Sequence, residues 1–141
     1  LAASQAGMAF SNSSVALVHG MSRPIGAHFH VAHGLSNAML LPKITEFSVK
    51  GNEERYATCA RVMKWAVEND NDAVACSKLI ENLFILNEDL KVPSPRNLGH
   101  SADHDLLKLM ASQALTSGSP QNNPRVPTKK QIIQLYQEVW G

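Results

Sequence analysis

Apolar residues recur at helical spacing along most of this chain, and no segment alternates between apolar and polar residues as a half-buried strand does. The sequence also lacks the Asn-Gly and Asp-Gly pairs that most strongly indicate a β-hairpin. Its 141 residues, 44% of them hydrophobic, suffice to bury the core of one domain. The pattern therefore predicts an all-α fold in which six or more helices pack on one another.

The expected helices are separated by glycine, proline and small polar residues, which favour turns and helix ends. Residues 2 to 19 read as a buried helix ended by Gly20 and Pro24, and residues 20 to 32 read as a loop. Further helices are expected over residues 33 to 41, kinked or restarted at Pro42, over 53 to 67, 72 to 86, 101 to 115, and 128 to 140. The predicted N-caps are Asn71 or Asp72, Ser101 and Thr128.

Charge and cysteine content narrow the partners and the compartment. There are 13 basic and 12 acidic residues, and the densest basic spot is Lys129-Lys130 beside Arg125. This argues against nucleic acid or a membrane surface as a partner, because both require a basic patch. Cys59 and Cys76 are expected to be reduced and buried, which fits a cytoplasmic protein.

The sequence shows no signal for secretion or for membrane insertion. The N-terminus has no signal-peptide pattern, and no apolar stretch is long enough to cross a membrane. The chain begins with Leu1 rather than Met and opens directly into a helical pattern, so we expect it to be part of something longer.

Four of the six histidines fall within fifteen residues: His19, His28, His30 and His33. Neutral imidazole is the commonest ligand of borderline divalent metals. If His19 closes one helix and His33 opens the next, the turn between them lets both rings reach one point. Composition alone leaves a metal site and ordinary structural histidines about equally open.

The other histidines are weaker candidates. His28 and His30 would point to opposite faces of an extended segment, so that one approaches the site and the other is solvated. His100 and His104 flank the start of an expected helix and are more typical of local hydrogen bonding than of catalysis.

The order of motifs from Ala6 to Pro42 resembles the signature of the iron-containing alcohol dehydrogenase family. The matching runs are Ala6 to Asn12, His19-Gly20-Met21, Pro24 to Ala27, His33-Gly34 and Asn37 to Pro42. The tail Asn123-Pro124-Arg125, followed by a last helix, is also similar to the family's ending. The resemblance therefore covers essentially the whole chain.

The resemblance implies the helical C-terminal domain of a dehydroquinate synthase-like fold, with residues 1 to 141 as a metal-binding domain and an upstream nucleotide-binding domain missing. It makes His19 and His33 two of four ligands of a divalent metal, iron being expected and zinc the alternative. The other two, an Asp and a His, would lie before Leu1. NAD or NADP would be the cofactor, and Phe10 would line the substrate pocket.

Two positions depart from the family pattern. Arg23 stands where the family commonly has a second histidine near the nicotinamide, and arginine cannot act as a base at neutral pH. Arg23 is expected instead to contact the cofactor's phosphate or ribose, or a substrate carboxylate. His28 or His30 could replace the missing proton carrier. Ala32 stands where a proline usually precedes the second ligand, which loosens the turn.

The function implied is metal-assisted hydride transfer between a small alcohol and its aldehyde or ketone, in an enzyme that often forms a homodimer. Two alternatives stay open: the same fold acting on another carbonyl substrate without metal, and a helical metal-binding module with no catalytic role. With two ligands and no nucleotide domain, the isolated chain is expected to bind metal poorly and to be inactive.

Overall fold

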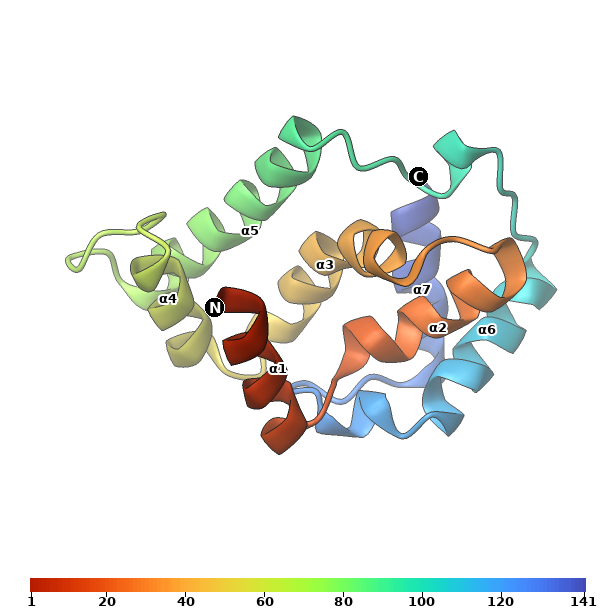
Figure 1. Ribbon diagram of the computed structural model, residues 1–141, viewed down its shortest axis with the longest axis horizontal. Coiled ribbons are helices and arrows are strands. Elements are labelled where there is room, and N and C mark those ends of the chain that lie inside the picture. Colours follow the sequence, from red (N-terminus) through yellow and green to blue (C-terminus); the bar gives the residue numbers. More distant parts are fainter.

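The computed structural model describes all 141 residues, and its regular elements are all helices (Figure 1). The order is α1 (Ala2–Ser13), α2 (Leu17–Phe29), α3 (His33–Val49), α4 (Glu53–Val62), α5 (Asp72–Asp89), the 3-10 helix η1 (Arg96–Leu98), α6 (His104–Thr116), the 3-10 helix η2 (Ser119–Asn122) and α7 (Lys129–Trp140). The predicted all-α class is confirmed. None of these helices combines the length and the apolar character that a bilayer-spanning segment requires.

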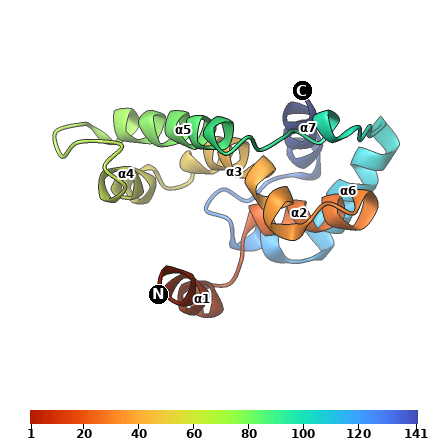
Figure 2. The same ribbon diagram turned by 45° about the horizontal axis from the view of Figure 1, so that its top comes forward.

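The helices form two unequal hydrophobic cores. The larger, called the main core below, joins α2, α3, α6 and α7, and its largest buried side chain is Tyr136. The Tyr136 hydroxyl donates a 2.7 Å hydrogen bond to the carbonyl of Met21, which ties α7 to α2. The smaller core lies between α4 and α5, called here the α4–α5 arm, which extends to one side of the molecule (Figure 2).

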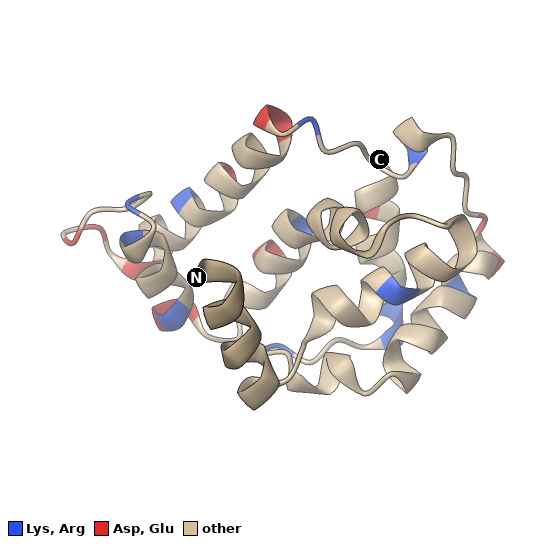
Figure 3. Ribbon diagram, in the orientation of Figure 1, with Lys and Arg blue, Asp and Glu red and all other residues tan.

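Helix α1 stands apart from both cores. None of its residues is buried, and Figure 3 shows no charged residue along it. The predicted single helix over residues 2 to 19 is wrong, because the chain breaks at Ser14, whose φ is 65°, and starts again at Leu17. The break separates an exposed helix from the buried helix α2.

The predicted loop over residues 20 to 32 is also wrong, because α2 continues through Gly20, Pro24 and Gly26 to Phe29. Pro24 removes one helical hydrogen bond, but its buried ring helps to pack α2 against its neighbours. Gly20 leaves room for η2, because a Cβ at this position would lie 3.0 Å from the Pro120 ring. Tertiary packing therefore overrides two residues that locally disfavour a helix.

Of the other expected helix boundaries, two N-caps are confirmed and two expectations change. Asn71 and Thr128 are N-caps, and Thr128 forms a reciprocal capping box with Gln131. The cap of α6 is Asp103 rather than Ser101, because the Asp103 carboxylate accepts from the backbone of Leu106. Pro42 lies inside a continuous α3, so no restart occurs there.

Two smaller expectations change in the α4–α5 arm. The helix expected to reach residue 67 ends at Val62, and the chain then turns through Lys64 with φ 61°. Both cysteines are free, but only Cys76 is buried and Cys59 is exposed, contrary to prediction. The expected cytoplasmic location stays a prediction.

Candidate metal centre and adjoining cleft

The rings of His19 and His33 face each other with centroids 5.2 Å apart. His19 lies in the first turn of α2, and His33 is the first residue of α3. The connection through residues 30 to 32 runs back along α2, so that α3 begins beside the middle of that helix (Figure 1). The two histidines therefore converge as the sequence predicted, although a crossing of helices, and not a long turn, brings them together.

The surroundings of His19 favour its neutral form. Partial burial lowers the pKa of the His19 imidazole, and the charges of His33 and Arg23 lower it further. A neutral imidazole keeps the lone pair that a metal requires. His33 is exposed, so an ion could reach it from solvent.

Asn37 completes this end of the site, and sequence reasoning missed it. Its Nδ2 lies 3.1 Å from His33 Nε2, one helical turn away, and its Oδ1 is buried without a hydrogen-bond partner. The signal was present, because Asn37 opens the Asn-Ala-Met-Leu-Leu-Pro run and stands four residues after His33. Asn37 therefore contacts the ring of His33, and its side-chain oxygen is buried without a partner.

The two imidazoles fit half of a metal site. Nowhere in the chain do three or more His, Cys, Asp or Glu residues gather closely enough to hold an ion. A catalytic divalent ion ordinarily takes at least three protein ligands. The pair therefore suits a site whose remaining ligands come from elsewhere, as the family resemblance implied.

A cleft of about 680 Å³ adjoins the histidine pair, within the size range of small-molecule sites. Helix α3 contributes much of its lining, and the apolar lining residues include Phe10, Val15, Val18, Ala38, Leu41 and Ile44. His19 and Asn37 lie toward one end, while Ser48, Tyr56 and Asn123 supply polar groups toward the other. Burial raises the pKa of the Tyr56 hydroxyl, so it stays protonated at neutral pH.

The two other predicted site residues, Phe10 and Arg23, differ in whether they line this cleft. Phe10 lines it from α1 and is 54% exposed. Arg23 is exposed one helical turn beyond His19, and it does not line the cleft. Its charge nevertheless acts on His19.

The remaining histidines do not line the cleft. His28 shares a 2.9 Å hydrogen bond with Gln113 on α6, and His30 caps the end of α2 in a left-handed conformation. His100 stacks on Phe29 with ring centroids 4.9 Å apart. That His28 or His30 carries a proton in place of Arg23 stays a prediction, and their positions outside the cleft do not support it.

Comparison with solved structures defines the class of this fold. A crystal structure of 1,3-propanediol oxidoreductase superposes with a TM-score of 0.88 at 30% sequence identity, over 95% of this chain and 35% of the other. The alcohol dehydrogenase from Oenococcus oeni superposes with a TM-score of 0.86 at 34% identity, again over 95% of this chain and 35% of the other. The fold is that of the helical domain of these dehydrogenases.

Residues 1–140 match the family model described as "Fe-containing alcohol dehydrogenase family, C-terminal". The chain belongs to the iron-containing alcohol dehydrogenase family, which confirms the resemblance seen in its motifs. Lactaldehyde reductase of Escherichia coli K12 is 36% identical over 136 residues, covering 96% of this chain and 35% of the reductase. For 1,3-propanediol dehydrogenase of Citrobacter freundii the identity is 31% over 137 residues, with 96% and 35% covered. The chain thus spans about a third of the length of these relatives.

Proposed function

We propose that this chain is the metal-binding, helical C-terminal part of an NAD(P)-dependent alcohol dehydrogenase. The enzyme would interconvert a small alcohol and its aldehyde or ketone. The observation that supports this most strongly is the convergence of His19 and His33 beside an apolar cleft. Relatives named for lactaldehyde, 1-propanol and 1,3-propanediol point to short alcohols and carbonyls as the substrate class.

In this proposal His19 and His33 hold the divalent ion, and the two missing ligands come from an upstream segment. When bound, the ion polarises the substrate oxygen and a nicotinamide cofactor carries the hydride. The chain's own residues prepare that chemistry. His19 remains neutral because burial and neighbouring positive charge disfavour its protonation.

The cleft supplies the second part of the function. Phe10 and Leu41 present apolar surface that excludes water from a small alcohol. Arg23 carries a permanent positive charge near the histidine pair and cannot accept a proton at neutral pH. We therefore assign Arg23 to cofactor binding and assign no proton transfer to it. A homodimer is also proposed, on the family resemblance alone.

The test uses the natural full-length protein and the substitution His33→Ala, with His28→Ala as a matched control away from the cleft. We expect His33→Ala to lose bound metal, measured by elemental analysis, and to lose alcohol oxidation. His28→Ala should retain both.

Three results would contradict the proposal. Wild-type metal content in His33→Ala would remove His33 from the ligand set. Full activity in metal-free wild-type protein would instead favour a carbonyl reductase that uses this fold without metal. A protein that binds metal but shows no nicotinamide-linked activity would favour a non-catalytic metal-binding module.

A further inference from the structure

Two hollows lie end to end along α6 and α7, away from the cleft, and share His104 and Gln137 in their linings. We call them together the α6–α7 groove. The first hollow has a volume of about 680 Å³, and its cations are Lys108, Lys129 and Lys130. The second, of about 360 Å³, is lined by Arg96, His100 and Trp140 among others. Neither shares a lining residue with the cleft beside His19.

The groove contains positive charge that the protein does not neutralise. No Asp or Glu lines either hollow. Lys129 and Lys130 form no ion pair, and only Lys108 has an acidic partner, Asp105, at 3.0 Å. Unpaired lysines facing one concavity raise the local concentration of anions.

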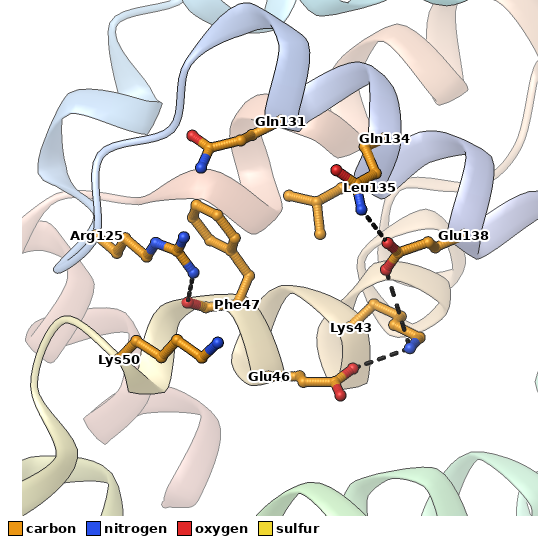
Figure 4. A pocket seen from close by; sticks show the side chains of 9 residues that line it. All are labelled: Lys43, Glu46, Phe47, Lys50, Arg125, Gln131, Gln134, Leu135 and Glu138. Atoms are coloured by element: carbon orange, nitrogen blue, oxygen red, sulfur yellow. Dashed lines mark hydrogen bonds and ion pairs between the residues drawn. The ribbon is translucent and has the colours of Figure 1, made fainter.

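A hollow on the neighbouring face of α7, which shares Gln134 with the first hollow of the groove, has a lining whose charges are mostly paired (Figure 4). There Lys43 binds Glu46 at 2.9 Å and approaches Glu138 at 3.9 Å. Arg125 donates to the carbonyl of Phe47 and stacks over its ring at 4.1 Å. The cations of that hollow are mostly satisfied within the protein, in contrast to Lys129 and Lys130.

The start of α7 adds hydrogen-bond donors to the first hollow. Thr128 caps the helix by accepting from the backbone of Gln131. The backbone N–H groups of Lys129 and Lys130, in the first turn, have no partner within the helix. The positive end of the helix dipole therefore coincides with the two unpaired lysines.

The residues around the second hollow include a buried donor without a partner. Trp140 lines this hollow and is only 7% exposed, yet its indole N–H has no hydrogen-bond partner. An unpaired buried donor is costly, and native proteins usually satisfy it. Arg96 and His100, which line the same hollow, are also donors.

We propose that the α6–α7 groove binds a ligand carrying two or more phosphate groups, either an inorganic polyphosphate or a nucleoside triphosphate. Lys130 and Gln137 are seven residues apart on α7, which corresponds to about 10 Å along the helix. That length exceeds one phosphate group and suits a short chain of them. The site is separate from the proposed dehydrogenase cleft and does not depend on it.

The test measures binding of tripolyphosphate and of ATP to the natural full-length protein by titration calorimetry. Saturating NADH is present throughout, so that any nicotinamide site is occupied. The variant Lys129→Gln/Lys130→Gln removes the unpaired charges, and Lys50→Gln/Lys91→Gln is a control with the same change of net charge at two exposed lysines. Circular dichroism checks that each variant is folded.

We expect the Lys129→Gln/Lys130→Gln variant to bind tripolyphosphate at least about tenfold more weakly, since two close charge-assisted contacts are lost. The control should change by less than about twofold, and wild-type binding should weaken steeply with salt. Equal affinity for ATP and tripolyphosphate identifies the phosphates alone as the ligand. Tighter binding of ATP extends the ligand to a nucleotide.

Two outcomes overturn the proposal. One is the absence of measurable binding of either probe to the wild-type protein. The other is equal weakening in both variants, which would show that net charge, and not the groove, attracts the anion. The substitution Trp140→Phe tests the second hollow, because losing one hydrogen bond should weaken binding about two- to tenfold. Unchanged binding in that variant would remove the second hollow from the site.

Discussion

The main core and the α4–α5 arm are stabilised in different ways. The main core buries large side chains such as Leu17, Met21 and Tyr136 between four helices. The arm buries mainly small ones, including Ala57, Ala60, Ala66 and Ala75, so that its two helices approach closely over a thin apolar layer. The main core therefore gains more from apolar burial than the arm does.

Polar contacts compensate for part of this difference in the arm. Arg61 donates to the carbonyl of Asp70 at 2.7 Å and to the carboxylate of Asp72 at 2.8 Å. Lys78 binds Asp70 at 2.7 Å. These contacts close the loop between α4 and α5. The candidate site lies on helices of the main core, and a metal centre needs such rigid support to keep its ligands in place.

The largest expected effect follows from truncating the main core. Tyr136→Ala removes a fully buried ring and its hydrogen bond to Met21, and should lower the free energy of unfolding by about 3–5 kcal/mol. Urea denaturation followed by circular dichroism measures this. Leu79→Ala, in the arm, is the matched variant and should cost about 2 kcal/mol, near the lower end of such substitutions.

Hydrogen exchange would distinguish local opening of the arm from unfolding of the whole chain. Leu79→Ala should speed exchange in α4 and α5 while α2 and α7 remain protected, because weakly packed regions open locally. Tyr136→Ala should speed exchange throughout the chain. Equal acceleration of all helices by Leu79→Ala would show that the arm and the main core unfold as one unit.

The junction between the two regions should give the next largest effect. Gly51 follows α3 at the start of the arm, and a Cβ there would lie 2.5 Å from the backbone of Pro124 and 2.7 Å from that of Arg125. Backbone atoms cannot move aside as a flexible side chain can. Gly51→Ala should therefore lower the free energy of unfolding by about 1–3 kcal/mol in urea titrations.

Gly7→Ala is the matched control for this junction. Nothing lies within 4 Å of a Cβ at Gly7, and α1 is an exposed helix. Alanine should stabilise that helix by about 0.5–1 kcal/mol or leave the whole chain unchanged. A neutral result for Gly51→Ala would mean that the arm shifts freely relative to Pro124.

Sequence patterns predicted the helical class and several caps because these depend on local chemistry. Thr128 and Asn71 accept hydrogen bonds from their own helix, so adjacent residues suffice to identify them. Pro24 and Gly20 misled the reading of α2 because their effect depends on partners far along the chain. Gly20 meets Pro120, a hundred residues away, and no local pattern reveals that contact.

The sequence predicted only part of the candidate site, because some of its residues can be recognised only from their contacts in the folded chain. His19 and His33 stand out as metal-binding residue types within a dense histidine cluster. Asn37 is an ordinary helical residue until its distance to His33 Nε2 is known. His28 and His30 belong to the same cluster in sequence but point elsewhere, because α2 continues to Phe29 and carries them past the site.

The smallest effect concerns the polar contacts of the arm. The hydrogen bond from Lys78, together with that from the backbone of Val67, holds the pKa of Asp70 below its usual value. A lowered pKa in the folded state means that this carboxylate stabilises the arm at neutral pH. The contribution should disappear as the pH falls through the lowered pKa, because the folded protein must then take up a proton.

Asp70→Asn should therefore slightly lower the Tm at pH 7, and the difference from wild type should vanish in acid. Thermal unfolding between pH 7 and pH 2 measures this, with Asp89→Asn, at an exposed residue outside any ion pair, as the control. A difference in Tm that stays constant with pH would show that Asp70 acts through the geometry of its hydrogen bonds and not through its charge.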